Sequence, residues 1–337
     1  MPVRPRQQAR IGRYLVEQKL RRRSRFPLIL QLEPLFACNL SCAGCGKVRR
    51  PAEVLRRRMP VETAVAAVRE CGAPMVSIAG GEPLLHPEIG RLVRALVRRK
   101  VYIHLCTNGL LLEEALGDVA PSPFLTWVVH IDGLRERHDG SVGRAGVFDT
   151  AVQGLLAAKR AGFSVMTNTT VYASDSSGSV RAVLDYLNDD LGVDAMMIAP
   201  GYAQRDAGGD GHYLTAAASR ELCRAVLADR DESAWRFNHS PLYLDFLTGD
   251  VDLDCTPWAI PCYSVLGWQR PCYQRADGYC GTYRELLETT DWARYGHASG
   301  DPDCRDCLAH SGFEPSAVLR TLSSPRELVR AARETVG

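Results

Sequence analysis

The sequence of 337 residues has no long apolar run and little net charge. No stretch approaches the roughly 20 apolar residues that a membrane-spanning helix needs, and the N-terminus lacks the apolar core of a secretory signal. The 41 basic and 39 acidic side chains nearly cancel, so the chain as a whole has no field that would attract nucleic acid. We therefore expect a cytoplasmic protein without a nucleic-acid partner.

Positive charge is concentrated in residues 1–26. Only one acidic side chain lies among the basic ones, which are Arg4, Arg6, Arg10, Arg13, Lys19, Arg21, Arg22, Arg23 and Arg25. Four apolar residues pair at intervals of four, namely Ile11 with Leu15 and Val16 with Leu20. This spacing predicts a basic amphipathic helix.

Apolar strands and amphipathic helices alternate from residue 27 to about residue 230. The expected strands are 28–32, 75–79, 101–106, 124–131, 164–172 and 195–199. The expected helices are 59–71, 87–99, 147–161, 178–190 and 215–229. Such alternation favours a parallel sheet, and six repeats predict an α/β fold with a partial (β/α)6 TIM-like barrel, although an open sheet would show the same repeats.

The alternation stops near residue 231, where scattered tryptophans, prolines and cysteines begin. We therefore divide the chain into three regions. These are a basic amphipathic arm at 1–26, a barrel at 27–230 and a cysteine-rich, irregular extension at 231–337.

The chain has 12 cysteines, which in a reducing compartment favour metal ligation or catalysis over disulfides. Cys38, Cys42 and Cys45 bring three thiols into eight residues shortly after the first expected strand. A 4Fe-4S cluster held by three thiolates keeps one iron open for a substrate or cofactor. A structural zinc site, the alternative, normally has four protein ligands and no open position, and no fourth Cys or His follows at short spacing.

The C-x3-C-x2-C pattern, followed by Gly80-Gly81-Glu82-Pro83 after the second expected strand, resembles the radical S-adenosylmethionine superfamily. By this resemblance the Gly-Gly-Glu-Pro segment holds the methionyl amine of S-adenosylmethionine, which chelates the open iron through its amine and carboxylate. The resemblance also places four further residues at the cofactor, namely Asn108, Asp132, Asn168 and Gly201. An Asp-Gly pair such as the one at 132–133 is otherwise typical of a simple turn.

Longer matches resemble the adenosyl-hopene synthases, which join a 5′-deoxyadenosyl group to the alkene of a bacterial hopanoid. The matching stretches are LEPLF (32–36), CAGCGK (42–47), CGAP (71–74), SIAGGEPLLH (77–86), LCTN (105–108), LYLDFL (242–247), GWQRPCY (267–273) and HSGFE (310–314). Cys262 and Cys280 stand outside the expected pattern. The resemblance implies that a cluster cleaves S-adenosylmethionine reductively and that the adenosyl radical adds to the terminal CH2 of a hopene-type lipid.

The tertiary radical left on such a lipid needs one hydrogen atom, and a thiol can donate it because its S–H bond is weaker than the C–H bond that forms. Cys106 ends the expected strand 101–106, on the same face as Tyr102 and His104 and at the end where barrel active sites lie. An isolated strand cysteine is more often a small buried hydrophobe. The match at 105–108 assigns Cys106 as the catalytic hydrogen donor.

Four cysteines of the extension follow the spacing C-x16-C-x31-C-x2-C, namely Cys255, Cys272, Cys304 and Cys307. They predict a second 4Fe-4S cluster or a zinc site, either of which would hold together a segment with a poor core of its own. The long gaps also fit a set of unlinked thiols.

The expected partners follow from the resemblance. A hopene dissolves only in lipid, so the basic arm is expected to dock on the inner face of an anionic membrane, or else to pack on the barrel. A reducing protein such as flavodoxin or ferredoxin would supply electrons. Two other functions fit the sequence: a radical enzyme that modifies a ribosomal peptide and carries an auxiliary cluster, and a non-catalytic iron-sulfur scaffold. The first would need a peptide-recognition domain, which is not expected before the barrel, and the second would have no use for an open cluster.

Overall fold

The computed structural model describes residues 5–330 apart from 203–211, 231 and 325. Its centre is one nine-stranded sheet in the order β6-β5-β4-β3-β2-β1-β7-β8-β9. Six parallel strands come from the expected barrel region: β1 (Ile29–Glu33), β2 (Met75–Ile78), β3 (Tyr102–Thr107), β4 (Leu125–His130), β5 (Ser164–Val171) and β6 (Ala195–Pro200). They match the six strands expected from the sequence and confirm the α/β partial-barrel fold.

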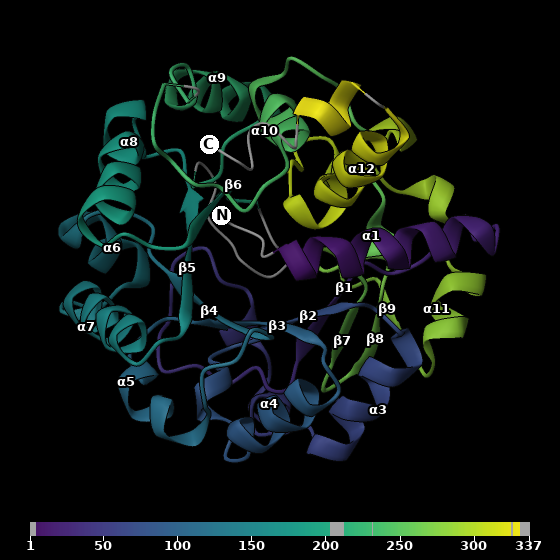
Figure 1. Cartoon of the computed structure of the whole chain (residues 1–337), viewed down its shortest axis with the longest axis horizontal. Coiled ribbons are helices and arrows are strands. Elements are labelled where there is room, and N and C mark those ends of the chain that lie inside the picture. The colour runs from purple at the N-terminus through teal and green to yellow at the C-terminus, as the bar shows by residue number, and fades with distance from the viewer. Residues whose placement is uncertain (1–4, 203–211, 231, 325, 331–337) are drawn as a thin grey trace.

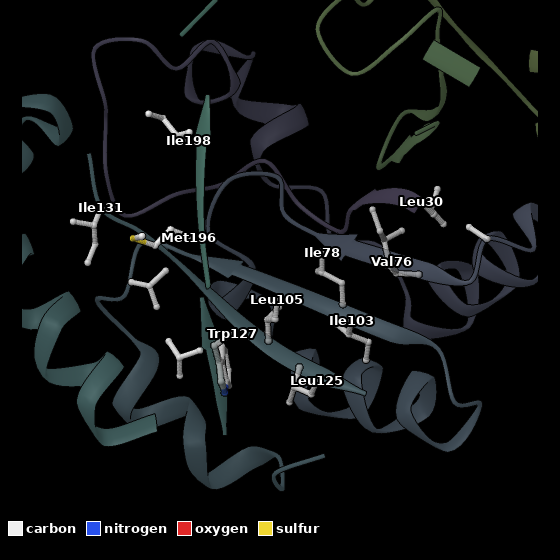
Figure 2. Packing of buried hydrophobic residues seen from close by; sticks show 14 of the residues in the cluster. Leu30, Val76, Ile78, Ile103, Leu105, Leu125, Trp127, Ile131, Met196 and Ile198 are labelled. Carbon is white, nitrogen blue, oxygen red and sulfur yellow. The ribbon is translucent and has the colours of Figure 1, made fainter. Parts of the chain in front are cut away.

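Helices cover the outside of this sheet (Figure 1). They are α3 (Val61–Cys71), α4 (Ile89–Arg98), α5 (Leu112–Ala115), α6 (Arg135–Val142), α7 (Val147–Arg160), α8 (Ser177–Asp185) and α9 (Ala216–Val226), while the short α2 (Ala52–Leu55), which has no buried residue, lies in the chain between β1 and α3. Alternate strand residues point outward into one large apolar core, of which Figure 2 shows Leu30, Val76, Leu105 and Trp127. Each of these four is at most 1% exposed, so this side of the sheet is fully packed.

The inner face of the sheet is packed differently. The residues that alternate with the outer core are half-buried and largely polar, among them Gln31, Ser77, His104, His130 and Asn168. Because successive strand residues point to opposite faces, these side chains line the interior of the partial barrel. The interior wall therefore carries the groups that can meet a ligand.

The extension adds to both edges of the sheet. β7 (Cys262–Ser264) runs parallel to β1, and β8 (Gly267–Arg270) and β9 (Gly278–Cys280) follow it antiparallel, while Phe237 bridges Met196 of β6. Its helices are α10 (Pro241–Thr248), α11 (Tyr283–Thr289) and α12 (His310–Ser323), and α10 packs on both α9 and α12. The sequence does not predict these three strands, because runs of three or four residues are too short to show a period of two.

The amphipathic helix expected near the N-terminus is α1 (Pro5–Leu20). Its Leu15 packs in a small core with Leu28, which precedes β1. Val16 and Leu20 are 59% and 79% exposed, so one apolar pair points away from the protein. Within the described residues no helix combines the length and apolar character needed to cross a bilayer.

Candidate functional site

The loop after β1 carries Cys38, Cys42 and Cys45, all of them half-buried. The Cys45 N–H donates a hydrogen bond to the Cys42 carbonyl (3.1 Å), which turns the loop. Burial, followed by the nearby thiols of Cys45 and Cys38, raises the pKa of Cys42 to about 12. Burial also raises the pKa of Cys38 to about 11. Neighbouring thiols of this kind become thiolates when a positive centre such as a metal group compensates their charge.

Three half-buried thiols in one loop can serve as ligands of one metal group. Within the described residues, no group of three or more His, Cys, Asp or Glu side chains is placed so that it could hold a metal ion. A 4Fe-4S cluster takes one thiolate at each ligated iron, and three thiolates leave the fourth iron open. A donor set of sulfurs also suits iron-sulfur chemistry. The loop thus fits the expected cluster, and the ligand role of each cysteine stays a prediction.

The Gly80-Gly81 segment lies directly against the chain that leads into the cysteine loop. The Gly81 N–H donates to the Leu35 carbonyl (3.1 Å), and the Glu82 N–H donates to the Ala37 carbonyl (2.8 Å). Gly80 has a φ of +116°, and a Cβ at Gly81 would lie 2.0 Å from the Ala37 oxygen. Backbone packing therefore requires both glycines and fixes this segment next to the thiols. Their contact with S-adenosylmethionine stays a prediction.

Glu82 joins the ends of β2 and β3. Its carboxylate, in a residue only 1% exposed, accepts hydrogen bonds from the Thr107 hydroxyl (2.9 Å), the Asn108 N–H (2.8 Å) and the Leu84 N–H (3.1 Å). Burial raises the pKa of Glu82 to about 7, although these hydrogen bonds oppose the rise. The next residue, Pro83, is buried in a short 3-10 turn. The Glu82 side chain thus supports the shape of the predicted cofactor segment from within the protein.

Asn108 connects this network to the cysteine loop. Its Nδ2 donates a hydrogen bond to Asn39 Oδ1 (2.7 Å) and lies 3.8 Å from the Cys38 sulfur. Its Oδ1 accepts a hydrogen bond from the Leu110 N–H (3.0 Å). A continuous hydrogen-bonded path therefore runs from Glu82 through Asn108 to the first cysteine of the loop.

Asp132 is held inside the protein, just after β4. Its Oδ2 accepts a hydrogen bond from the Ser141 hydroxyl (2.9 Å) and lies 3.0 Å from His130 Nε2, and its Oδ1 accepts from the Thr170 N–H (2.9 Å). Burial would raise the pKa of Asp132, but the contacts with His130 and the hydrogen bonds outweigh it and lower the pKa. The negative charge of Asp132 contributes to the raised pKa of Cys42, so Asp132 lies near the cysteine loop. Its contact with a cofactor stays a prediction.

Asn168 lies on β5, and Gly201 directly follows β6. Asn168 pairs with His130 in the sheet and is half-buried. The Gly201 N–H donates to the Val171 carbonyl (2.7 Å), and a Cβ at this glycine would lie 2.7 Å from the Tyr172 ring. Gly201 therefore makes room for Tyr172, and the cofactor roles of both predicted residues stay predictions.

Tyr172, His212 and Tyr213 are residues of this site that the sequence reasoning missed. The ring centroids of Tyr172 and His212 are 4.3 Å apart, and the Tyr213 hydroxyl donates to the Gly44 carbonyl (3.2 Å). A Cβ at Gly44 would lie 2.9 Å from the Tyr172 hydroxyl, so the rings lie against the cysteine loop. Tyr172 directly follows β5 at the end of the barrel where active sites lie, which is a signal that could have found it. No sequence pattern points to the other two.

Cys106 lies on the inner face of β3, and its sulfur is 3.5 Å from the Ser77 hydroxyl on β2. Burial raises the pKa of the Cys106 thiol to about 11, although the contact with Ser77 opposes the rise. The thiol packs with apolar side chains from the next three strands, Val128, Met166, Ala195 and Met197. At neutral pH it is therefore a protonated thiol at a half-buried, apolar position.

The four cysteines of the second predicted set lie together in the extension. The thiols of Cys307, Cys272 and Cys304 all act electrostatically on the Cys255 thiol. Two cysteines outside the expected pattern lie elsewhere in the sheet: Cys280 ends β9, and Cys262 of β7 has its sulfur 3.5 Å from the Glu33 carboxylate. The structure thus brings together the four residues that the spacing selected.

Comparison with known proteins identifies two regions. Residues 32–187 match the radical SAM superfamily, and residues 196–331 match a domain of unknown function, DUF3463. Pre-heme d1 synthase of Dinoroseobacter shibae is 30% identical over 229 residues, which are 64% of this chain and 54% of that protein. Mycofactocin maturase MftC of Mycobacterium tuberculosis is 29% identical over 143 residues, 41% of this chain and 36% of that protein. The chain thus spans about half the length, or less, of these curated relatives. The domain boundary expected near residue 231 stays a prediction.

Solved structures share the fold. SuiB of Streptococcus suis bound to its precursor peptide SuiA has a TM-score of 0.65 at 16% identity, over 93% of this chain and 77% of that one. The protein anSMEcpe with bound AdoMet has a TM-score of 0.60 at 17% identity, over 91% of this chain and 96% of that one. At such identities the likeness shows the fold alone. The family match over residues 32–187 and the sequence relatives show that this part of the chain is a radical S-adenosylmethionine domain, of a superfamily whose members use a 4Fe-4S cluster and S-adenosylmethionine.

Proposed function

We propose that this protein adds the 5′-deoxyadenosyl group of S-adenosylmethionine to the alkene of a hopene-type lipid, and that Cys106 donates the hydrogen atom that completes the product. Cys38, Cys42 and Cys45 would hold the 4Fe-4S cluster, which supplies the electron that splits S-adenosylmethionine into methionine and the 5′-deoxyadenosyl radical. The observation that carries the proposal is the position of Cys106 against an apolar cluster of the inner wall, where burial raises the pKa of its thiol to about 11.

Cys106 lies close to the predicted cofactor site. It stands two residues before Asn108, whose amide group contacts the Cys38 sulfur, and the Glu82 carboxylate acts electrostatically on the Cys106 thiol. A substrate carbon between the cysteine loop and β3 would therefore be near both the source of the radical and a hydrogen donor.

A thiol at this position can complete the reaction by donating one hydrogen atom, and every atom and electron is then accounted for. The radical adds to the terminal CH2 and forms a C–C bond, which leaves a tertiary carbon radical. The Cys106 S–H bond breaks homolytically, its hydrogen atom forms the new C–H bond, and a thiyl radical remains on Cys106. One electron from a reductant of the flavodoxin or ferredoxin class and one proton restore the thiol. Because burial raises its pKa to about 11, Cys106 keeps its hydrogen at neutral pH.

The side chains around Cys106 fit a hydrocarbon. Val128, Met166 and Ala195 are at most 3% exposed and form a small apolar cluster on the strands that follow β3, against which the partly buried Cys106 and Met197 pack. A hydrocarbon would gain free energy by displacing water from Cys106 and Met197, at roughly 25 cal/mol per Å² of apolar surface. A peptide backbone at the same place would need hydrogen-bond partners, which the four apolar side chains do not offer.

The comparisons support a second substrate class, a peptide, more directly than a lipid. MftC is named a maturase, the SuiB structure contains a precursor peptide, and anSMEcpe has been solved with a Cp18Cys peptide. In a peptide-modifying enzyme the cysteine loop would have the same role. Cys106 would then be a wall residue, and its loss would leave the mass of the product unchanged.

A lipid substrate also requires access to a membrane, and α1 offers a surface for it. Val16 and Leu20 are exposed together with basic side chains on and just after the helix, namely Arg13, Lys19, Arg21, Arg22, Arg23 and Arg25. Each Lys or Arg near an anionic leaflet contributes about 1 kcal/mol of attraction. We infer that this side of α1 contacts the inner face of the membrane while Leu15 holds the helix on the barrel.

Product analysis tests the proposal. Anaerobic, reduced protein is incubated with S-adenosylmethionine and diploptene, and the lipid extract is examined by mass spectrometry for a saturated adenosyl adduct. The protein with Cys42→Ala should yield neither 5′-deoxyadenosine nor adduct, whereas Cys71→Ala, a buried cysteine of α3, should yield both. If the wild-type protein releases 5′-deoxyadenosine but never forms an adduct with diploptene, the lipid substrate is wrong and the peptide class takes its place.

A further inference from the structure

A buried ion pair lies beside the cysteine loop. Glu33 ends β1 and is 0% exposed, and Lys47, two residues after Cys45, is 5% exposed. Lys47 Nζ donates a hydrogen bond to Glu33 Oε2 (2.9 Å) and lies 2.9 Å from Oε1. Apolar side chains of similar size usually stabilise a core as well as such a pair does, so stability alone does not account for it. No step of the proposed reaction uses either charge.

The pair is enclosed by the barrel and the extension together. Lys47 Nζ lies 5.2 Å from the ring centroid of Phe36, in the chain before the cysteines, and 4.7 Å from that of Tyr273, in the loop after β8. The faces of aromatic rings attract a cation. The Cys262 thiol of β7 donates to Glu33 Oε2 (3.5 Å). β7 lies directly beside β1 (Figure 1), so the extension completes the enclosure.

Hydrogen bonds hold the extension's part of this enclosure in place. Cys262 pairs with Gln31 in the ladder between β1 and β7. The Gln269 side-chain amide of β8 donates hydrogen bonds to the carbonyls of Cys272 (2.8 Å) and Tyr273 (3.0 Å). The Tyr273 ring is therefore fixed where it covers the ammonium group of Lys47.

Both charges lie close to the third cysteine of the loop. Two residues of chain span at most about 7 Å, so the backbone of Lys47 is near that of Cys45. Burial raises the pKa of Tyr273 well above its usual value, and nearby charges, among them those of Glu33 and Cys45, add to the rise. The ring that covers Lys47 thus lies near both Glu33 and Cys45. A metal group on Cys45 would therefore have one fixed positive charge and one fixed negative charge nearby.

Fixed charges act on an iron-sulfur cluster because its own charge changes on reduction. The reduced cluster carries one more negative charge than the oxidised one, so a nearby cation favours the reduced state and a nearby anion opposes it. We propose that the Glu33–Lys47 pair positions Cys45 and sets the reduction potential of the cluster expected in the loop, with Lys47 raising it and Glu33 lowering it. This inference rests on the cluster of the proposed function and not on the lipid substrate.

Redox titration of the anaerobically reconstituted full chain tests the proposal without any lipid. The electron paramagnetic resonance signal that changes when S-adenosylmethionine is added reports the cluster with the open iron. At one fixed solution potential, Lys47→Met should lower the ratio of reduced to oxidised cluster about tenfold, which is about 59 mV for a one-electron couple. A unit charge about 10 Å away has roughly this effect at an effective dielectric constant of about 20. Glu33→Gln should raise the ratio by a similar factor.

Two controls separate the effect of charge from that of packing. The double variant with Glu33→Gln and Lys47→Met has no unpaired buried charge, so its ratio should return to that of the wild type. Glu53→Gln, at an exposed position of α2, should leave the ratio unchanged, because water and salt screen its charge. A loop that was merely loosened would shift the ratio in the same direction in both single variants.

The proposal is overturned if the two single variants shift the ratio in the same direction, if neither shifts it, or if the double variant shifts it as far as a single one. If neither single variant folds, the double variant decides: the wild-type ratio supports the proposal, and a tenfold change, or loss of the cluster from a folded chain, refutes it. A wild-type protein without a cluster would remove both this proposal and the proposed function. One that holds the cluster but forms no lipid adduct would remove the lipid substrate alone.

Discussion

Glu82 should make the stability of this protein depend on pH near neutrality. Its carboxylate is almost fully buried, and burial raises its pKa to about 7, against an ordinary value of about 4.3 for an exposed Glu. The native state therefore favours the protonated form. A carboxyl of this kind contributes its full stability below the pKa of the unfolded chain and loses that contribution as the pH rises through 7.

The size of the effect follows from the shift. Each pKa unit corresponds to about 1.4 kcal/mol, and between pH 5.5 and 8 the native carboxyl loses its proton while the unfolded one is already ionised. Wild-type stability should therefore fall by about 2 kcal/mol over this range on account of Glu82 alone. Glu82→Gln removes the ionisable group, so its stability should not share this fall.

Chemical denaturation under anaerobic conditions measures this effect at pH 5.5 and pH 8. The difference in unfolding free energy between the wild type and Glu82→Gln should shift by about 2 kcal/mol in favour of the variant at the higher pH. Glu113→Gln, at an exposed position of α5, should show no such shift. A Glu82→Gln difference that is the same at both pH values would refute the argument that burial controls this carboxyl.

Three further predictions concern the cysteine loop and its surroundings. Gly81→Ala should lower the free energy of unfolding by about 1–3 kcal/mol and weaken the binding of S-adenosylmethionine, because the new Cβ would lie 2.0 Å from the Ala37 oxygen. Gly140→Ala is the matched control, because its new Cβ would meet nothing within 4 Å. Equal stability and affinity in the two variants would contradict the packing. Cys42→Ala should stop cleavage of S-adenosylmethionine, measured as 5′-deoxyadenosine by chromatography, and full cleavage would contradict the assignment of the loop. Deletion of residues 1–25 should abolish flotation with anionic liposomes, and unchanged flotation, or none in the wild type, would count against membrane docking by α1.

The barrel could be predicted because its strands and helices are long enough to show their periods. β3, for example, alternates buried and half-buried residues over the five positions from Ile103 to Thr107, and the sequence predicted a strand with His104 and Cys106 on one face. β7 and β9 have three residues each, so no period could appear, and their place beside β1 depends on contacts between distant segments.

The site was predictable where spacing within the sequence decides it. Three cysteines within eight residues must lie near one another, and the structure has them in one loop. Tyr172 and Tyr213 were missed because their approach to Gly44 arises only when β5 and the chain after β6 fold onto the loop. The structural role of Glu82 could not be predicted either, because its hydrogen-bond partners Thr107 and Asn108 lie at the end of β3, far away in the sequence.

The most direct test of the central claim is the mass of the product that Cys106→Ala forms from diploptene in deuterated water. The wild-type protein should give a saturated adenosyl adduct carrying one deuterium, because the exchangeable thiol hydrogen of Cys106 enters the product. The variant should still cleave S-adenosylmethionine, since the thiol acts after addition, but should give an unsaturated or hydroxylated adduct, or little adduct. The same saturated adduct at the wild-type rate, with solvent deuterium in the product of neither protein, would contradict the role of Cys106.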